Sequence, residues 1–198
     1  MSQPIVRRWT EDEFFAWQRF QPERYEFVDG FPVRMMAGAK NAHDDIVVNL
    51  VAVLRDGLRG SGCRPFTADG SIRTAAGRIR RPDAGVDCGR RDPDGYKAAE
   101  PRLVAEVLSP STRDLPTIEK VGEYKALETL DYILLIEPNA PDFVLWSRDA
   151  EREWVSARID DLGEAIPLPA LGLSLPLAEL YDGIEFGPFP RLVIGGPA

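Results

Sequence analysis

The pattern of apolar and polar positions predicts a chain in which helices alternate with short strands. Apolar residues recur at helical spacing in several stretches, which is typical of a helix that buries one face. Thr10 and Glu13 have the spacing of a capping box, in which side-chain and backbone groups bond reciprocally at the start of a helix. The predicted helices begin at Thr10, run from Asn41 to before Gly60, run from about Thr117 to Glu128, and cover Leu177 to Tyr181.

Runs of β-branched and aromatic residues bounded by Gly, Pro and Asp predict the strands. Asp29-Gly30 lies between two such runs and predicts a β-hairpin, because these residues supply the positive φ angles of a two-residue turn. Pro82 favours a sheet edge or the start of a strand, because proline has no N–H for the ladder. The predicted strands are residues 25–28, 31–36, 63–67, 71–74, 79–86, 103–108, 131–136, 143–146 and 153–158.

The stretch from Leu103 to Thr112 (LVAEVLSPST) is unusual because its apolar run carries one carboxylate, Glu106. A carboxylate in such a strand is costly to bury unless it is paired, protonated or bound to a metal. Glu106 therefore needs a partner. The hydroxyls of Ser109, Ser111 and Thr112 lack the GxSxG context of a nucleophile, so we interpret them as capping groups at the end of the strand.

The composition is that of a globular protein, and no internal repeat or second domain is indicated. We expect one domain over residues 1–198, with a loosely packed Gly- and Pro-rich tail from residue 187 onward. The absence of a signal pattern and of a long apolar run predicts a cytoplasmic location. Cys63 and Cys88 stand far apart without a CxxC or Cys/His pattern, so we expect them to pack as small hydrophobic residues, with neither a disulfide nor a zinc site.

The net charge of -8 argues against a protein that holds nucleic acid by bulk electrostatics, because nonspecific DNA affinity comes mainly from phosphate neutralisation. Residues 71–113 are an exception, since Lys and Arg outnumber Asp and Glu there. Two interpretations stay open for this segment: a solvated face of loop and strand, or a patch that follows a phosphate backbone. The arginines concerned are Arg78, Arg80, Arg81, Arg90 and Arg91.

Asp83 and Glu106 are candidate metal ligands. If their strands are neighbours in one sheet, both carboxylates can converge on one divalent ion, and Mg²⁺ prefers such oxygen ligands together with waters and substrate phosphates. The backbone carbonyl of Val107 would be a third protein ligand. Lys120, on the helix that follows, can orient an attacking water or neutralise charge on a scissile phosphate. Tyr124 lies one turn from Lys120 on the same helix face.

His43, the only histidine, lies near the start of the helix that begins at Asn41. A capping or surface position is at least as plausible for it as an auxiliary catalytic role, because no Ser or Cys motif at a known spacing accompanies it.

The order of these motifs resembles the Uma-type putative restriction endonuclease family of the PD-(D/E)XK nuclease superfamily. The resemblance rests on Arg81-Pro82-Asp83, on LVAEVLSPST at 103–112, which is its most specific part, and on Lys120 and Tyr124. It extends to RWTEDEF near the start, RYEFVDG at 24–30, His43 and LDYILLIEP at 130–138, and it covers about residues 8–182.

The resemblance implies an α/β fold of the restriction-endonuclease type, with a central mixed β-sheet flanked by helices and an N-terminal helix and hairpin. It implies Asp83 and Glu106 as ligands of Mg²⁺ or Mn²⁺, and Lys120 as the catalytic lysine. Glu26 matches an N-terminal acidic position of the family, where it either assists metal binding or pairs across the hairpin.

Leu108 occupies the position where the superfamily pattern has its lysine, two residues after the acidic residue. We therefore expect the catalytic lysine on the next helix, where Lys125 is an alternative to Lys120.

The leading hypothesis is a metal-dependent endonuclease that hydrolyses DNA phosphodiester bonds with a metal-activated water. Two alternatives stay open: a catalytically quiet binding or assembly module with the nuclease fold, which the acidic charge favours, and a phosphodiesterase that acts on RNA or a small substrate. A homodimer is plausible, because double-strand cleavage is conveniently done by two related sites and two-fold pairs are the commonest oligomers.

Overall fold

A computed structural model describes residues 7–35, 40–108 and 115–186 of the chain. The helices are α1 (Glu11–Gln18), α2 (Asn41–Gly57), α3 (Leu115–Lys125) and α4 (Leu177–Leu180), and Pro169–Leu171 form a 3-10 turn. The strands are β1 (Tyr25–Val28), β2 (Phe31–Arg34), β3 (Arg64–Thr67), β4 (Ile72–Ala75), β5 (Arg78–Arg80), β6 (Ala84–Asp87), β7 (Pro101–Val107), β8 (Tyr132–Glu137), β9 (Asp142–Arg148), β10 (Trp154–Ile159), β11 (Ala165–Leu168) and β12 (Leu173–Pro176).

Six strands form the larger sheet, in the order β10-β9-β8-β7-β6-β3. β7 and β8 run parallel while the other neighbouring pairs are antiparallel, so this sheet is mixed. A parallel pair needs a crossover connection, and α3 provides it. β7 is buried along almost its whole length, as expected for a central strand covered on both faces.

The smaller sheet has the order β2-β1-β5-β4 and is antiparallel. The predicted hairpin is present, with positive φ angles of 52° at Asp29 and 88° at Gly30. α1 covers one face of this sheet, where Phe14 stacks on Phe27 with ring centroids 4.9 Å apart. The predicted capping box starts α1.

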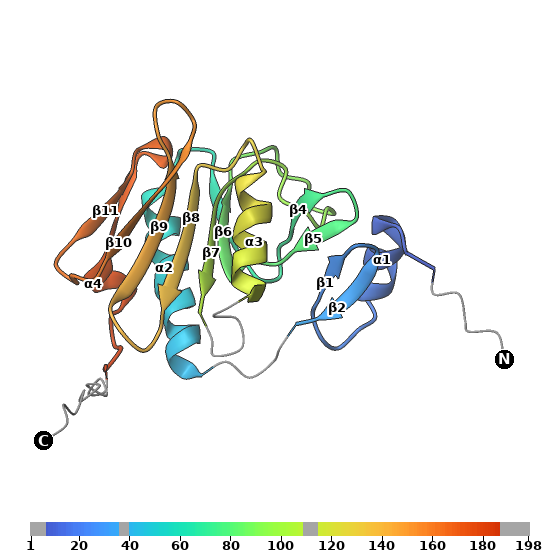
Figure 1. Cartoon of the computed structure of the whole chain (residues 1–198), viewed down its shortest axis with the longest axis horizontal. Coiled ribbons are helices and arrows are strands. Elements are labelled where there is room, and N and C mark those ends of the chain that lie inside the picture. The colour runs from blue at the N-terminus through green and yellow to red at the C-terminus, as the bar shows by residue number, and fades with distance from the viewer. Residues whose placement is uncertain (1–6, 36–39, 109–114, 187–198) are drawn as a thin grey trace, which may run out of the picture.

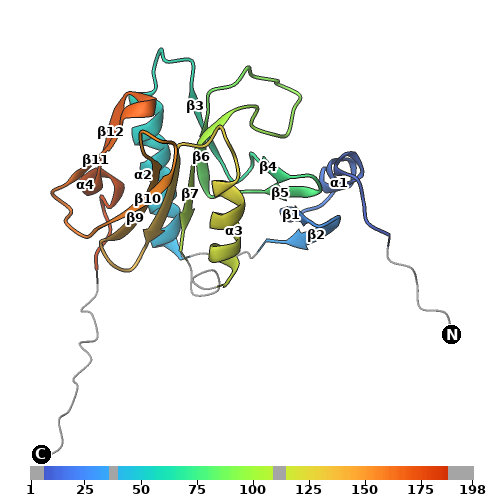
Figure 2. The same cartoon turned by 45° about the horizontal axis from the view of Figure 1, so that its top comes forward.

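α3 lies between the two sheets (Figures 1 and 2). Its Tyr124 packs with Val104 and Ile133 of the larger sheet and with Ile72 of the smaller sheet. Side chains alternate along a strand, so Glu106 lies on the same face of β7 as Val104. The face that supports α3 is therefore also the face that carries Glu106.

The opposite face of the larger sheet is covered by α2, α4 and the β11-β12 pair (Figure 2). Leu50 and Leu54 of α2 are fully buried there, in one cluster with Leu103 and Ala105 of β7. These layers confirm the predicted fold class, an α/β protein with a central mixed sheet flanked by helices. Within the three described ranges, no helix is long and apolar enough to cross a membrane.

Some predictions fall outside the described residues. These are the tail from residue 187 onward, the capping role of Ser109, Ser111 and Thr112, and the end of the predicted hairpin at residue 36.

The predicted strand over residues 79–86 is wrong as a single strand. β5 ends at Arg80 in the smaller sheet and β6 begins at Ala84 in the larger one, so Arg81-Pro82-Asp83 connects the two sheets. Pro82 has no N–H to donate to a ladder, which suits a connection between sheets better than the middle of a strand. The β11-β12 pair was not predicted, because the alternation of Leu and Pro in this segment hides it.

The expectation that Cys63 and Cys88 pack without a bond is also wrong. They form a disulfide, with their Cα atoms 4.0 Å apart. Arg64 pairs with Asp87 across β3 and β6, so the two cysteines just outside this pair face each other despite a sequence separation of 25. The pairing of strands, which the spacing of the cysteines does not reveal, brings them together.

We expect the Cys63→Ser/Cys88→Ser double variant to lose about 3 kcal/mol of unfolding free energy, because the cross-link restricts the unfolded chain. Urea denaturation followed by circular dichroism, with and without dithiothreitol, measures the loss. Reductant should destabilise the wild type and leave the double variant unchanged. Equal stability of the wild type in both conditions would contradict a stabilising disulfide.

Candidate active site

The candidate site lies where the chain crosses from the smaller to the larger sheet. Ala84 pairs with Ala105 across β6 and β7, so the next residues outward, Asp83 and Glu106, face each other. Oδ2 of Asp83 accepts a hydrogen bond from the Val107 N–H at 2.8 Å. The two predicted metal ligands thus come together at one end of the β6-β7 pair.

Glu106 is buried, with 9% of the residue exposed. Its Oε1 accepts a hydrogen bond from the Tyr124 hydroxyl at 2.5 Å, and the Lys120 Nζ lies 3.2 Å from Oε1 and 3.3 Å from Oε2. Both donors come from α3, one turn apart. The partners that a buried carboxylate requires are therefore supplied by this helix.

Lys120 joins the two sheets. Its Nζ lies 3.0 Å from Oε1 of Glu26 on β1, in addition to its contact with Glu106 on β7. The same Glu26 oxygen accepts the Arg81 N–H at 3.1 Å. The N-terminal hairpin therefore contributes a third carboxylate to the site.

His43 reaches the site from the first turn of α2. Its Nε2 lies 3.4 Å from Oδ2 of Asp83, and its side chain is 18% exposed. The hydrogen bond with Asp83 raises the pKa of His43, although burial acts against it. Of the two positions considered for His43, the structure thus places it against a predicted metal ligand rather than at an open surface.

Lys125, the alternative to Lys120, lies elsewhere. Its Nζ is 3.0 Å from the centroid of the Trp146 ring. Leu108 adds no side-chain cation to the site, and its N–H donates to the Ile136 carbonyl at 2.8 Å, which extends the pairing of β7 with β8. Of the two candidate lysines, Lys120 is the one that contacts the carboxylates.

The family model "Uma2: Putative restriction endonuclease" matches residues 11–178. The chain belongs to the Uma2 family. The resemblance deduced from the motifs is thereby confirmed.

Two other proteins are similar to this Uma2 chain. The uncharacterized protein slr1290 of Synechocystis sp. is 28% identical over 179 residues, which are 89% of this chain and 93% of that protein. The crystal structure of a putative nuclease belonging to DUF820 from Anabaena variabilis has a TM-score of 0.67 at 19% identity, and the match covers 87% of this chain and 97% of that one. This second likeness shows a shared fold.

The candidate site of this Uma2 protein carries an excess of negative charge. Burial raises the pKa of Glu106 to about 7, and the carboxylates of Asp83 and Glu26 act in the same direction against the opposing effect of Lys120. Burial would lower the pKa of Lys120, but Glu106 and Glu26 raise it above its ordinary value. Three carboxylates thus lie around the Lys120 ammonium and the Arg80 guanidinium, which pairs with Glu26, and the remaining negative charge favours a cation.

The donor set fits a hard divalent cation such as Mg²⁺ or Mn²⁺. Asp83, Glu106 and the Val107 carbonyl offer oxygen ligands, and Mg²⁺ is usually held by one or two carboxylates, with waters and substrate phosphates as the remaining ligands. Among the residues that the structure describes, no three His, Cys, Asp or Glu side chains cluster so as to hold a metal ion. Water and substrate would therefore have to complete the coordination.

We expect the affinity of this Uma2 protein for Mn²⁺ to fall as the pH drops below about 7. The cation requires the ionised carboxylate of Glu106, whose pKa in the metal-free protein is about 7. Protons therefore compete with the metal, and the affinity should fall by up to about tenfold for each pH unit below the pKa. Calorimetric titration with Mn²⁺ at pH 6, 7 and 8 measures this dependence.

His43 needs its own control in that titration, because its pKa is also raised. A His43→Gln variant should keep the pH dependence if Glu106 causes it. An affinity for Mn²⁺ that is the same at pH 6 and pH 8 would contradict the role of Glu106 as a ligand.

Both interpretations of the arginine-rich segment are wrong for its first three members. Arg80 and Arg81 are buried, and Arg78 is half-buried. Arg78 and Arg80 pair with carboxylates of α3 and of the hairpin, and Arg81 donates to backbone carbonyls of the loop before β4. Arg90 and Arg91 are exposed, as the solvated interpretation expects. Sequence reasoning missed the buried pairs because their acidic partners lie about 40 or more residues away.

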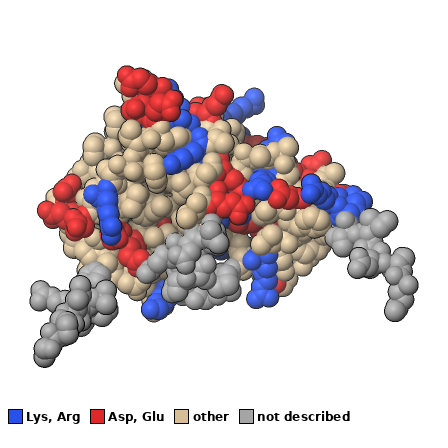
Figure 3. Space-filling model, in the orientation of Figure 1, with Lys and Arg blue, Asp and Glu red and all other residues tan. Residues whose placement is uncertain are grey.

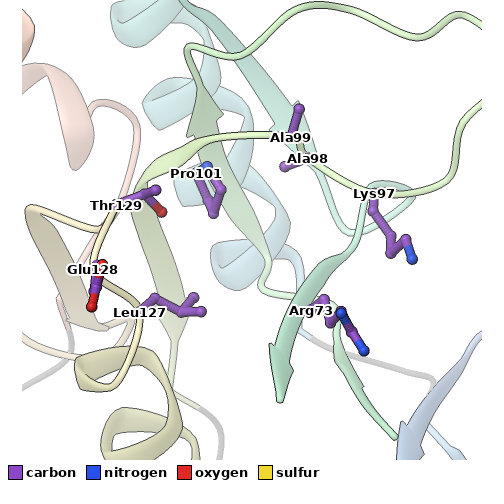
Figure 4. A pocket seen from close by; sticks show the side chains of 8 residues that line it. All are labelled: Arg73, Lys97, Ala98, Ala99, Pro101, Leu127, Glu128 and Thr129. Atoms are coloured by element: carbon purple, nitrogen blue, oxygen red, sulfur yellow. The ribbon is translucent and has the colours of Figure 1, made fainter. Parts of the chain in front are cut away.

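A hollow near the other end of α3 is separate from the candidate site. It is lined by residues of β4, of the segment before β7 and of the loop after α3 (Figure 4). Arg73 and Lys97 on one side of it both pair with Glu11 of α1, at 2.7 Å and 3.0 Å. None of the predicted site residues lines this hollow.

Proposed function

We propose that this Uma2 protein is a metal-dependent endonuclease that hydrolyses phosphodiester bonds of DNA with a metal-activated water. The observation that carries the proposal is the meeting of Asp83, Glu106 and Lys120 at the junction of the two sheets, with the Lys120 Nζ 3.2 Å from Glu106. Membership of the family described as "Putative restriction endonuclease" supports the same function.

Asp83, Glu106 and the Val107 carbonyl would hold the cation. A bound Mg²⁺ or Mn²⁺ lowers the pKa of a water ligand and stabilises negative charge on the phosphate. The Tyr124 hydroxyl fixes one oxygen of Glu106, and the Val107 N–H fixes one oxygen of Asp83. Both carboxylates are therefore held in place before the cation and the substrate bind.

Lys120 would act as a hydrogen-bond donor and a positive charge. Two of its possible bonds go to Glu26 and Glu106, and a third can reach a water or a phosphate oxygen. Its pKa is raised, so the ammonium stays protonated at neutral pH and does not serve as a general base. Its proposed role is to orient the attacking water and to offset charge that develops on the phosphate.

Incubation of supercoiled plasmid with the purified protein and Mg²⁺ or Mn²⁺ tests this function. We expect nicked or linear DNA that depends on the metal and disappears with excess EDTA. Absence of cleavage with both metals and with every form of DNA tested, including single-stranded and methylated DNA, would count against an endonuclease.

A catalytically quiet nuclease-fold module is the second candidate. The observation that favours it is that Lys120 and Tyr124 already pair with Glu106, so the buried carboxylate has partners without a metal. Absence of Mn²⁺ binding in calorimetry would favour this module, whereas binding that requires Asp83 and Glu106 favours the nuclease. A panel of RNA and small phosphodiesters decides the substrate class if metal binds but DNA stays intact.

We also propose that the protein acts as a homodimer, because cleavage of both DNA strands is readily done by two sites related by two-fold symmetry. Sedimentation velocity across a concentration series tests the oligomeric state.

A further inference from the structure

Arg80 is a buried arginine directly before the Arg81-Pro82-Asp83 connection, and 7% of its side chain is exposed. Its guanidinium donates to both oxygens of Glu123 on α3, from Nε at 2.9 Å and from Nη2 at 2.5 Å. Its Nη1 donates to Oε2 of Glu26 on β1 at 3.0 Å. Arg80 therefore holds a helix residue and a strand residue at the same time.

Glu123 is bound from several sides of the smaller sheet. The Thr74 hydroxyl donates to its Oε2 at 2.7 Å, and Arg78 also pairs with it. Although burial opposes ionisation, hydrogen bonds from Arg80 and Thr74 lower the pKa of Glu123 to about 2, so this carboxylate is charged at neutral pH. Acidic and basic side chains lie close together where α3 meets the smaller sheet (Figure 3).

Lys120 and Glu123 are three residues apart on α3, so they lie on the same face of the helix. Arg80 pairs with Glu123 and Glu26, and Glu26 pairs with Lys120. These four residues form a closed set of contacts, the positioning ring, which runs from α3 to the smaller sheet and back. A rotation of α3 about its axis would break both contacts that the ring makes with the helix, the one at Lys120 and the one at Glu123.

We infer that Arg80 and Glu123 are positioning residues, which hold the Lys120 ammonium between Glu26 and Glu106. The inference rests on the proposed function, in which Lys120 acts on the water and the phosphate. Neither Arg80 nor Glu123 contacts Asp83 or Glu106 through any bond of the described residues, so their effect passes through Lys120 and Glu26.

The charge of Arg80 also limits how strongly Glu26 attracts Lys120. Arg80 binds Oε2 of Glu26 and leaves Oε1 to Lys120 and the Arg81 N–H. Without the guanidinium, Glu26 would be a buried carboxylate short of one partner, and it would draw the ammonium away from Glu106, because buried charges are weakly screened. Without Glu123, the guanidinium would keep only its longer contact with α3, from Nη2 to Oε1 of Glu119 at 3.4 Å.

Brief labelling of the whole protein with acetic anhydride at one pH tests the inference, with mass spectrometry to quantify Lys120 and Lys125 in the same molecules. In Glu123→Gln we expect the ratio of Lys120 to Lys125 labelling to rise about tenfold, the shift that follows from losing one charge-assisted hydrogen bond. In Arg80→Gln the freed Glu26 carboxylate should instead hold the Lys120 ammonium more tightly and lower the ratio, whereas Arg80→Lys keeps the charge and should change it less. Thr74→Val, a milder change beside Glu123, should shift the ratio in the same direction as Glu123→Gln.

Asp131→Asn is the matched control. Asp131 is a buried carboxylate that pairs with Arg102 and Arg152 just before β8, away from the candidate site, so its loss should weaken the fold without raising the labelling of Lys120. A ratio that is unchanged in folded Glu123→Gln and Thr74→Val, or one that rises equally in Asp131→Asn, would overturn the inference.

A second readout separates positioning from general destabilisation. In the plasmid assay, Glu123→Gln should lower kcat while KM and the affinity for Mn²⁺ stay near the wild-type values. The labelling needs neither DNA nor metal. If the wild-type protein cleaves no DNA, the proposed function is contradicted, and the ratio of Lys120 to Lys125 labelling still tests the positioning ring.

Discussion

Glu106→Gln is expected to lower the rate of DNA cleavage by on the order of a thousandfold or more, because the variant loses the ligand charge that holds the cation. The affinity for Mn²⁺ should fall with it. The shape of the side chain is kept, and the amide oxygen can still accept hydrogen bonds from Tyr124 and Lys120. Burial raises the pKa of Glu106 to about 7, so at pH 8 the carboxylate is mostly ionised but its buried charge costs the folded state free energy. Replacing it with a neutral amide should therefore not lower the thermal midpoint.

Single-turnover cleavage of plasmid, calorimetry with Mn²⁺ and a thermal melt are the three measurements. Asp83→Asn should behave in the same way, because its amide oxygen can still accept the Val107 N–H while the ligand charge is lost. Asp45→Asn, which changes an exposed carboxylate of α2, is the matched control and should cleave like the wild type. A Glu106→Gln variant with wild-type cleavage would remove Glu106 from the mechanism.

Lys120→Met is expected to reduce cleavage by on the order of a hundredfold or more, the loss that follows from removing one electrostatic contact to the transition state. Binding of Mn²⁺ should be retained or become tighter, because the ammonium no longer competes for Glu106 and Glu26. Cleavage and metal binding therefore separate in this variant, whereas they fall together in Glu106→Gln. Cleavage at saturating Mn²⁺ and the dissociation constant for Mn²⁺ measure the two effects.

Lys125→Met is the control for the choice of lysine. Lys125 lies over the Trp146 ring, so its replacement should cost some packing and leave the cleavage rate within a few fold of the wild type. The opposite result, an active Lys120→Met and an inactive Lys125→Met, would transfer the catalytic role to Lys125.

The local signals in the sequence were sufficient for most of the elements. The capping box at Thr10, the Asp29-Gly30 turn and the apolar spacing after Asn41 each predicted an element that the structure contains. Each of these signals involves residues only a few positions apart, and backbone preferences and hydrogen bonds at that range act in almost any fold.

The candidate residues were also found from the sequence, through the unusual position of Glu106 and through the family motifs. The contacts among these residues could not be predicted from the sequence. The sequence left Lys120 and Lys125 as alternatives and left the location of His43 open, and it placed Asp83 within one strand over residues 79–86. The structure brings Lys120 and His43 to the carboxylates and places Asp83 where the chain passes between sheets.

By itself the sequence determined the family, the order of the helices and most of the strands, and the set of residues that bear the chemistry. The tertiary structure alone decided that Cys63 bonds to Cys88, that Arg80 binds Glu123, and that α3 packs against both sheets. The physical reason is that these contacts join residues tens of positions apart. Their free energies depend on which strands pair and on which side chains are buried away from water. Neither can be predicted from a pattern of residues that are close together in the sequence.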